Sequence, residues 1–475
     1  MEIKKFINEY SENIKNDKAA IFIGSGISVN SGFVSWKDLL RNVASDIGLN
    51  IEKETHDLIS VAQYYQNKEN RAALNKIIVN SFSKPKKFNK YFDIITKLPI
   101  KTIWTTNYDH EIEEYLKKNG HDSIDIKKTN RSVAVENNNS NTIIYKFHGD
   151  YEIADEAVIT KDDFETFSGK RTAFEAILKS QLLSKTFVFI GYSFNDPNLL
   201  FLLSKMRIVY EQHIRDHYLI IREIKKNCYD TENDYQYDLI KQQLFLDDLK
   251  RYGIKAVLIK EYDDIYEIFS SIKNNLDSRK IFVAGSSRDY GEWTLEKARY
   301  FLFELGRRLV ELGCQVGTGY IEGVGPELSN GILNCVSEKG LSISDYLIIK
   351  RLPLIGNSDE HISPVVREMY QHNMINDAGI ILFLFGNNRY DGIIKPSKTV
   401  LEEFERSKKY GKYIIPVGAT GYAASIILDA ISKENSEFKY LVPHIGTLKD
   451  SENIKKLVDT VSEIILSIRN SSFEK

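Results

Sequence analysis

The chain has 475 residues, of which 42% are hydrophobic and 27% are charged, and its formal net charge at pH 7 is -2. This nearly balanced charge excludes a general binder of nucleic acids or of membrane surfaces, and no run of about 18 apolar residues indicates a membrane span. The length is too great for one ordinary core and predicts two domains.

Short apolar strands alternate with helical patterns from residue 18 to about 259. The expected strands are residues 19–24, 100–107, 142–149, 186–193, 217–222 and 254–259. They are rich in Ile, Val, Phe and Tyr without clean alternation, which is typical of strands buried on both faces of a parallel α/β sheet. Residues 36–98 have no strong strand signal, so we expect inserted helices there.

A polar stretch at residues 270–280 interrupts this pattern, and a second alternation follows. It predicts strands at 280–291, 315–319, 346–352, 378–386 and 413–418, with a helix at 293–313. We therefore expect a boundary near 275, with one domain at 1–275 and another at 276–475. The predicted fold class is α/β, with two Rossmann-like domains, each a mainly parallel sheet flanked by helices.

The first expected strand runs directly into the sequence GSGIS, which contains Gly24, Ser25, Gly26 and Ser28. A Gly-x-Gly turn that ends a strand and opens a helix leaves backbone N–H groups free to hold a phosphate. A glycine-rich turn is also a common structural element, so this motif alone is compatible with either role.

The second expected strand is followed by TTNYD, which contains Asn107 and Asp109. Open α/β sheets bind ligands at the carboxyl ends of their strands, where both residues would lie. On the other hand, the same residues could simply cap the helix expected at 110–120.

Two further motifs end strands in the same way. KFHGD places His148 at the end of the strand at 142–149, although a single histidine is more often structural than catalytic. GYSFNDP offers a tight turn at Gly191 and Ser193, followed by a helix that begins with Asp196 as its cap and Pro197 as its first residue.

Together and in this order, the four motifs resemble the sirtuin-like NAD-binding family, in particular its bacterial defence branch, over residues 10–260. The resemblance implies that the Gly-x-Gly turn holds the NAD pyrophosphate, that the histidine is the general base, and that the Gly-x-Ser turn contacts the adenosine half. The Asn and Asp would contact the nicotinamide ribose and the carboxamide. The implied catalytic residues are Asn107 and His148, and the implied NAD-contacting residues are Gly24, Ser25, Gly26, Ser28, Asp109, Gly191 and Ser193.

The residues suit cleavage of the bond between nicotinamide and ribose. Nicotinamide leaves as a neutral molecule, so the site needs little from a strong acid and must mainly stabilise an oxocarbenium-like ribose. A residue that titrates near neutrality can steer water, as His148 can, and a neutral amide such as Asn107 can position hydroxyls.

Deacylating sirtuins carry a Cys₄ zinc module and an acyl-lysine channel. This chain has three cysteines, Cys228, Cys314 and Cys335, none in a C-x-x-C pair, so it lacks the zinc module and is expected to hold no metal. Water is therefore the favoured acceptor, which makes an NAD glycohydrolase. The alternative is a non-catalytic scaffold that senses NAD or ADP-ribose, and a deacylase ranks third.

The second half repeats the pattern of glycines and polar residues at expected strand ends. Arg367 could bind a phosphate, and Glu402 or Glu403 could bind ribose hydroxyls, with Glu403 favoured; each could equally be a solvated helix charge. The candidate ligand-contacting residues are Gly285, Ser286, Arg288, Gly323, Gly325, Arg367, Asn388 and Glu403.

This half resembles a SLOG domain over residues 278–475, with the catalytic motif of its phosphoribohydrolase relatives degraded, which favours ligand sensing. A sirtuin-like domain followed by a SLOG domain resembles the NAD-cleaving effectors of Thoeris antiphage systems. The resemblance implies that a cyclic ADP-ribose isomer, made by a TIR-domain partner, binds the second domain and releases NAD cleavage, which leads to NAD depletion and abortive infection. It also implies a cytoplasmic homotetramer.

Overall fold

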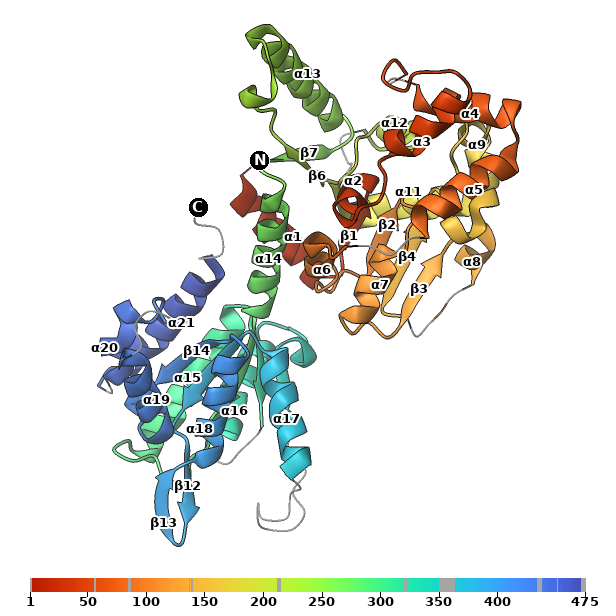
Figure 1. Cartoon of the computed structure of the whole chain (residues 1–475). Coiled ribbons are helices and arrows are strands. Elements are labelled where there is room, and N and C mark those ends of the chain that lie inside the picture. The colour runs from red at the N-terminus through yellow and green to blue at the C-terminus, as the bar shows by residue number, and fades with distance from the viewer. Residues whose placement is uncertain are drawn as a thin grey trace. The chain divides into compact units, whose positions relative to one another are not determined.

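The computed structural model divides into two compact units, Met1–Lys273 and Asn274–Lys475 (Figure 1). The division falls inside α14 (Asp263–Asp277), the helix that also contains the expected boundary near 275. The structure describes residues 2–54, 57–83, 87–135, 137, 140–211, 215–319, 323–349, 364–433, 438–450 and 452–470, except the side chains of 364, 366, 367, 370, 371 and 470.

The first unit contains a seven-stranded sheet in the order β3-β4-β2-β1-β5-β6-β7, and all of its pairings are parallel. The strand order reverses between β1 and β5, and open α/β sheets bind ligands at the carboxyl edge beside such a reversal. The strands are β1 (Ala19–Ile23), β2 (Thr102–Thr105), β3 (Ile124–Lys127), β4 (Thr142–Lys146), β5 (Thr186–Ile190), β6 (His217–Arg222) and β7 (Ile254–Ile259).

Helices cover both faces of this sheet. Phe22, Phe187 and Phe189 pack against α11 and α12 on one face, while α1 packs on the other, where the Tyr10 hydroxyl donates to the Ala20 carbonyl at 2.8 Å. The helices are α1 (Ile3–Lys15), α2 (Ser25–Ser28), α3 (Trp36–Asp46), α4 (Leu58–Lys68), α5 (Arg71–Phe82), α6 (Lys90–Ile95), α7 (Glu111–Lys118), α8 (Asn130–Ala134), α9 (Lys161–Glu165), α10 (Phe167–Lys170), α11 (Thr172–Ser184), α12 (Pro197–Tyr210) and α13 (Glu232–Lys250).

The expected helical insertion at 36–98 is confirmed, and α3, α4 and α5 form a small apolar core of their own. Strand β3 was not expected. Its sequence, IDIK, alternates apolar and charged residues at the edge of the sheet, and three of its four residues are only partly buried. A short edge strand of this kind gives a weaker sequence signal than the continuous apolar runs at the centre.

Three glycines allow the ends of β1 and β5 to approach closely. A Cβ atom on Gly24 would lie 2.3 Å from the Gly191 carbonyl oxygen, and Gly191 has a φ of +60°. The N–H of Gly26 donates to that same carbonyl at 3.0 Å, and the N–H of Gly24 donates to the Ile190 carbonyl at 2.9 Å. The expectation that both glycine N–H groups are free for a phosphate is therefore wrong, because they join the two turns instead.

The second unit contains a five-stranded parallel sheet in the order β10-β9-β8-β11-β14, with its own reversal between β8 and β11. Its strands are β8 (Lys280–Ala284), β9 (Gln315–Thr318), β10 (Leu347–Ile349), β11 (Ile380–Leu384) and β14 (Tyr413–Val417). The antiparallel hairpin of β12 (Asn387–Tyr390) and β13 (Ile393–Pro396) was not expected, because β12 follows directly after the strand expected at 378–386 and its sequence, NNRY, is mostly polar.

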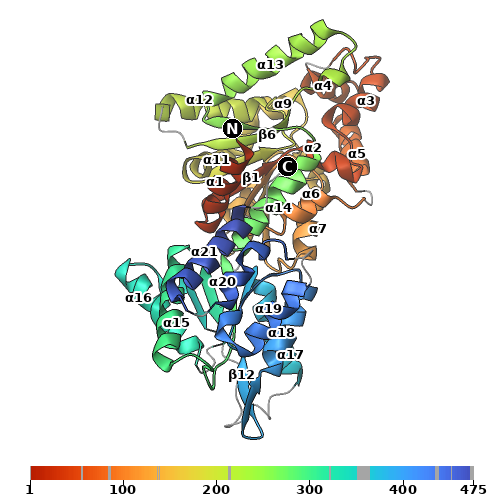
Figure 2. The same cartoon turned by 90° about the vertical axis from the view of Figure 1, so that its left-hand side faces the viewer.

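The helices of the second unit form two layers, one on each side of its sheet (Figure 2). One layer holds α15 (Leu295–Glu311), α16 (Gly325–Glu338) and α21 (Ile454–Asn470), and the other holds α17 (Pro364–Asp377), α18 (Lys398–Lys409) and α19 (Tyr422–Lys433), with α20 (Ile445–Lys449) beside α19 and α21. The predicted α/β class with two mainly parallel sheets is confirmed. Among the helices that the structure describes, none is both long and apolar enough to cross a membrane.

The glycine contact between β1 and β5 leads to a first prediction. Gly24→Ala forces a methyl group against backbone that cannot move freely, so it should destabilise the fold by about 2 kcal/mol or more. The midpoint of urea unfolding measures this loss. Gly169→Ala is the matched control, because a Cβ atom there meets nothing within 4 Å. Equal midpoints for the two variants would contradict the close approach.

Candidate active site

Strand register places the two candidate catalytic residues at equivalent positions. Thr105 and Lys146 are the last paired residues of β2 and β4. Asn107 and His148 each follow two residues later, on neighbouring strands of the same sheet edge. The Gly24 turn ends the other neighbour of β2, so the structure brings these motifs together as expected for a ligand site at the carboxyl edge.

The Asn107 side chain is held by the glycine turn. It is 4% exposed, and its Nδ2 donates to the Ser28 hydroxyl at 2.9 Å and to the Gly24 carbonyl at 3.3 Å. Its Oδ1 is buried and has no hydrogen-bond partner among the described residues. Because a buried acceptor without a partner is costly, this atom is suited to receive a hydrogen bond from a ligand hydroxyl or a water.

Asp109 has the capping role considered for it. Its Oδ1 accepts a hydrogen bond from the N–H of Glu111 at 3.1 Å, at the start of α7. The residue is 2% exposed, and burial raises the pKa of its carboxyl although Lys146, the Glu111 N–H and the Ser28 hydroxyl each lower it. Its contact with a ligand stays a prediction.

His148 lies in an aromatic environment beyond β4. It is 6% exposed, and its ring packs on Phe147 and against the edges of Phe164 and Phe167. Its carbonyl accepts from the Val158 N–H at 2.8 Å, which fixes the backbone. A cavity of about 680 Å³ is lined by Val158 and Phe167 among other residues, and Phe167 also contacts the His148 ring.

The loop after β5 completes the edge. Gly191 forms the close contact with the glycine turn, and Ser193 is exposed two residues later. Asp196 caps α12, as expected, by accepting from the N–H groups of Asn198 and Leu199. Its other oxygen, Oδ2, lies 2.9 Å from Nε2 of His148. The sequence indicated the cap but not this pairing.

A cluster of charged side chains beneath the site was not recognised from the sequence. Lys146 is fully buried, its Nζ donates to the Asp109 carbonyl, and it lies 3.3 Å from Glu113 and 3.6 Å from Asp150. Both Lys146 and Asp150 belong to the KFHGD motif, in which only the histidine attracted attention. Within this motif, Lys146 contacts Asp109, His148 contacts Asp196, and Asp150 contacts His110.

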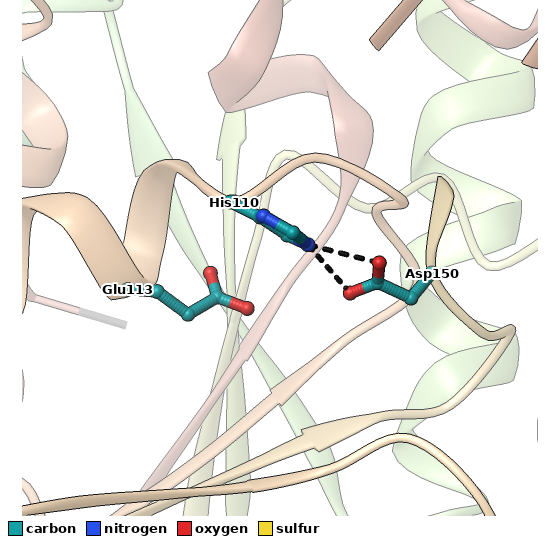
Figure 3. Close-up of side chains that lie close together, drawn as sticks. All are labelled: His110, Glu113 and Asp150. Carbon is teal, nitrogen blue, oxygen red and sulfur yellow. Dashed lines mark hydrogen bonds and ion pairs between the residues drawn. The ribbon is translucent and has the colours of Figure 1, made fainter. Parts of the chain in front are cut away.

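The same cluster contains a group of possible metal ligands. Figure 3 shows His110, Glu113 and Asp150, whose ligand atoms lie within 4.8 Å of one another. Nε2 of His110 contacts both carboxylate oxygens of Asp150, at 2.9 and 2.8 Å. The ammonium groups of Lys128 and Lys146 lie close to Asp150, so they compensate its negative charge without a metal ion.

The charge of Asp150 is well compensated. Burial alone would raise the pKa of its carboxyl, but His110, Lys146 and the Glu152 N–H outweigh burial and hold the pKa below its ordinary value. The donor set of nitrogen and carboxylate oxygens could bind a divalent ion, although the two lysines would oppose it electrostatically. The expectation that the protein holds no metal stays a prediction.

Three candidate residues of the second unit, Ser286, Arg288 and Gly323, lie at the switch point between β8 and β11. Asn387, which is fully buried, accepts on Oδ1 from the Arg288 N–H at 2.8 Å, and its carbonyl accepts from the Ser286 hydroxyl at 2.8 Å. Gly323 meets the same loop, since a Cβ atom there would lie 2.2 Å from the Ser287 carbonyl. The sequence pointed to Asn388, whereas Asn387 holds this loop.

The other candidates are dispersed around this loop. Gly285 lies against the Leu384 carbonyl, and Gly325 is buried in the first turn of α16. Asn388 is in β12, and its Oδ1 accepts from the neighbouring Arg389 N–H. The described contacts do not join Glu403, on α18, to the loop. Arg367 belongs to α17, and its side chain lies outside the described part of the chain.

Comparison with known families gives two matches in the expected order. Residues 101–240 match a SIR2-like domain, and residues 264–468 match the Sir2- and TIR-associating SLOG family. The protein named NAD(+) hydrolase ThsA from Bacillus cereus (strain MSX-D12) is 35% identical over 98% of this chain and 99% of its own length. The chain belongs to the ThsA family.

Other ThsA proteins agree with this assignment. The one from Cytobacillus dafuensis is 37% identical over 98% of this chain and 96% of its own length. The one from Enterococcus faecium is 36% identical over 99% of this chain and 100% of its own length. Full-length coverage shows that both units, and not only one, follow the ThsA arrangement, so the resemblance to a sirtuin-like unit followed by a SLOG unit is confirmed.

The SLOG unit provides a prediction about pH. Glu403 is 6% exposed, and burial raises the pKa of its carboxyl from 4.5 to about 8, with Glu402 adding to the effect. Its ionised form is disfavoured in the fold, so its contribution to stability is full below pH 4.5 and is lost as the pH rises to about 8.

Glu403→Gln should remove this dependence, because glutamine does not titrate. The variant should unfold at a higher temperature than the parent chain above pH 8, and the difference should shrink toward pH 4.5. Thermal unfolding of the full chain between pH 4.5 and about pH 8 measures this difference in unfolding temperature. Glu405→Gln, at an exposed position of the same helix, is the control. A constant difference across the range would contradict the burial of an ionisable Glu403.

Proposed function

We propose that this chain hydrolyses NAD⁺ to ADP-ribose and nicotinamide, with water as the acceptor. The observation that carries the proposal is the pair Asn107 and His148, at equivalent positions on neighbouring strand ends, with a buried, unpartnered amide oxygen on the first. The printed names of the full-length relatives, each an NAD(+) hydrolase, support the same reaction.

The site residues suit the stages of this reaction. The turn from Gly24 to Ser28 and the loop with Gly191 and Ser193 would hold the dinucleotide, with Ser25 and Gly26 beside the pyrophosphate. Asp109 would contact the carboxamide. Asn107 Oδ1 would receive a ribose hydroxyl or the attacking water, and His148 would accept the proton of that water. Nicotinamide leaves as a neutral molecule, so no strong acid is required opposite it.

The positive charge that develops on the ribose would be stabilised without a metal ion. The oxocarbenium-like transition state is positive, and the carboxylates of Asp109 and Asp196 lie at the same edge of the sheet. Beneath them, Lys146 and Lys128 compensate Asp150 and oppose the entry of a divalent ion into the His110 cluster. Nicotinamide release should therefore persist in the presence of a chelator.

The second unit would act as the sensor. We propose that a cyclic ADP-ribose isomer, made by a TIR-domain partner, binds near Gly285, Ser286, Arg288 and Gly323, with Gly325, Arg367, Asn388 and Glu403 as further contacts. The matched family is described as Sir2- and TIR-associating, which supports such a partner. Activation requires that this ligand favour one of two states of the chain. A cytoplasmic homotetramer that depletes NAD during infection completes the proposal.

The site assignment is tested by removing its two central side chains. His148→Ala and Asn107→Ala should each lower nicotinamide release by at least about 100-fold, because each removes a group that acts on the nucleophile, while leaving the chain folded. Release is followed by chromatography with the activated full chain.

His121→Ala is the matched control, since His121 bonds to the Thr96 carbonyl at the end of α7, away from the strand ends. Full turnover in either site variant would overturn the assignment. If the parent chain binds NAD but never cleaves it, the alternative of a sensing scaffold replaces the hydrolase.

The sensor assignment is tested with a panel of cyclic ADP-ribose isomers. One isomer should activate NAD cleavage by the parent chain, and Arg288→Ala should raise the concentration required for half-maximal activation at least about tenfold without changing the maximal rate. Arg299→Ala is the control, because Arg299 lies on α15, where it pairs with Glu327. Cleavage that is independent of every isomer would contradict a sensing role.

A further inference from the structure

Asp196 has two contacts that differ in kind. Its Oδ1 accepts from the N–H groups of Asn198 at 2.9 Å and Leu199 at 3.4 Å, which caps α12. Its Oδ2 lies 2.9 Å from Nε2 of His148, and the two side chains are 5% and 8% exposed. Capping of α12 accounts for the position of Oδ1 only. The position of Oδ2 against His148 needs a separate explanation.

The surroundings of this pair exclude most water. His148 contacts the rings of Phe147, Phe164 and Phe167, and the hydroxyl of Tyr192 is buried near Asp196. In such an environment a charge–charge contact is stronger than in water. A carboxylate here therefore interacts strongly with the imidazole ring that it faces.

Other charged groups near the ring are already paired. On α9, Asp163 forms an ion pair with Arg71 at 2.6 Å. Arg171, after α10, donates to the carbonyls of Lys128 and Glu156. Asp196 is thus the carboxylate that directly faces the His148 ring among the described residues.

The charge state of Asp196 agrees with this geometry. Burial alone would raise the pKa of its carboxyl, but His148 and the N–H groups of Asn198 and Leu199 outweigh burial and lower it. Asp196 is therefore a carboxylate at neutral pH. The Tyr192 hydroxyl stays protonated, because burial and the nearby Asp196 raise its pKa well above the ordinary value.

We propose that Asp196 is the positioning residue of His148: its carboxylate lies against Nε2 and orients the ring, leaves Nδ1 as the proton acceptor, and stabilises the imidazolium that forms. The kinetic part of this inference rests on the proposed NAD hydrolysis. A water then gives its proton to Nδ1 while its oxygen bonds to C1′ of the ribose. The C1′–N bond breaks, nicotinamide takes that electron pair and leaves neutral, and the imidazolium later gives its proton to solvent.

Asp196→Asn separates the two contacts. Asparagine caps helices as well as aspartate does, so the unfolding midpoint should hardly change, but the negative charge is lost. The ring should therefore lose its charged partner while the helix cap remains. The ring-proton signals of His148 in magnetic resonance spectra of the full chain at one fixed pH, assigned with His148→Gln, should move in Asp196→Asn.

Kinetics provide the second readout. The plateau rate is the rate of nicotinamide release at saturating NAD⁺. The plateau rate should fall at least about tenfold, because the imidazolium is no longer stabilised. Asp57→Asn is the matched control, since Asp57 caps α4 by accepting from the Ser60 N–H and is exposed.

The outcomes are distinguishable. Unchanged His148 ring signals in Asp196→Asn, or an unchanged plateau rate, would overturn the positioning role. If the parent chain releases no nicotinamide, the proposed hydrolysis fails, while the ring signals still decide whether Asp196 positions the ring. Asp196→Ala loses both contacts and should combine the same change in the ring signals with a lower unfolding midpoint, which separates the cap from the charge.

Discussion

The close backbone contact between Gly24, Gly26 and Gly191 is the constraint on which the rest of the site depends. It joins the ends of β1 and β5 at the point where the strand order reverses. With those strands fixed, α2 begins at once and Ser28 reaches the Asn107 amide. The Asn107 amide nitrogen therefore donates its hydrogen bonds within the protein, and its Oδ1 is left to accept one from a ligand. A side chain larger than hydrogen at Gly24 would separate these elements.

The electrostatics of the edge follow from two histidine–carboxylate pairs, one partly exposed at His110 and one buried at His148. His110 pairs with Asp150, whose charge is compensated by lysines, and this pair supports the loop from beneath. His148 pairs with Asp196, whose second oxygen caps a helix, and this pair faces the proposed reaction. Similar side-chain chemistry thus has a structural role in one place and a proposed catalytic role in the other.

The sequence was sufficient for the parts of the fold that depend on continuous apolar runs and on strand-end motifs. It predicted both parallel sheets, the helical insertion and the positions of Asn107 and His148. It did not predict edge strand β3 or the β12–β13 hairpin, whose residues alternate or are polar. Asp196, Lys146 and Asn387 were missed as partners because their roles depend on contacts between distant segments, which no local pattern records. The glycine N–H groups were assigned wrongly for the same reason, since their acceptors lie on another strand.

The central claim is that NAD lies across the carboxyl edge of the first sheet, with its reactive ribose between Asn107 and His148. The most direct test is a crystal structure of the His148→Ala chain with intact NAD⁺. The account predicts the pyrophosphate at the turn from Gly24 to Ser28 and a ribose hydroxyl or a water on Asn107 Oδ1. Dinucleotide bound only elsewhere, with Asn107 Oδ1 still unpartnered, would contradict it.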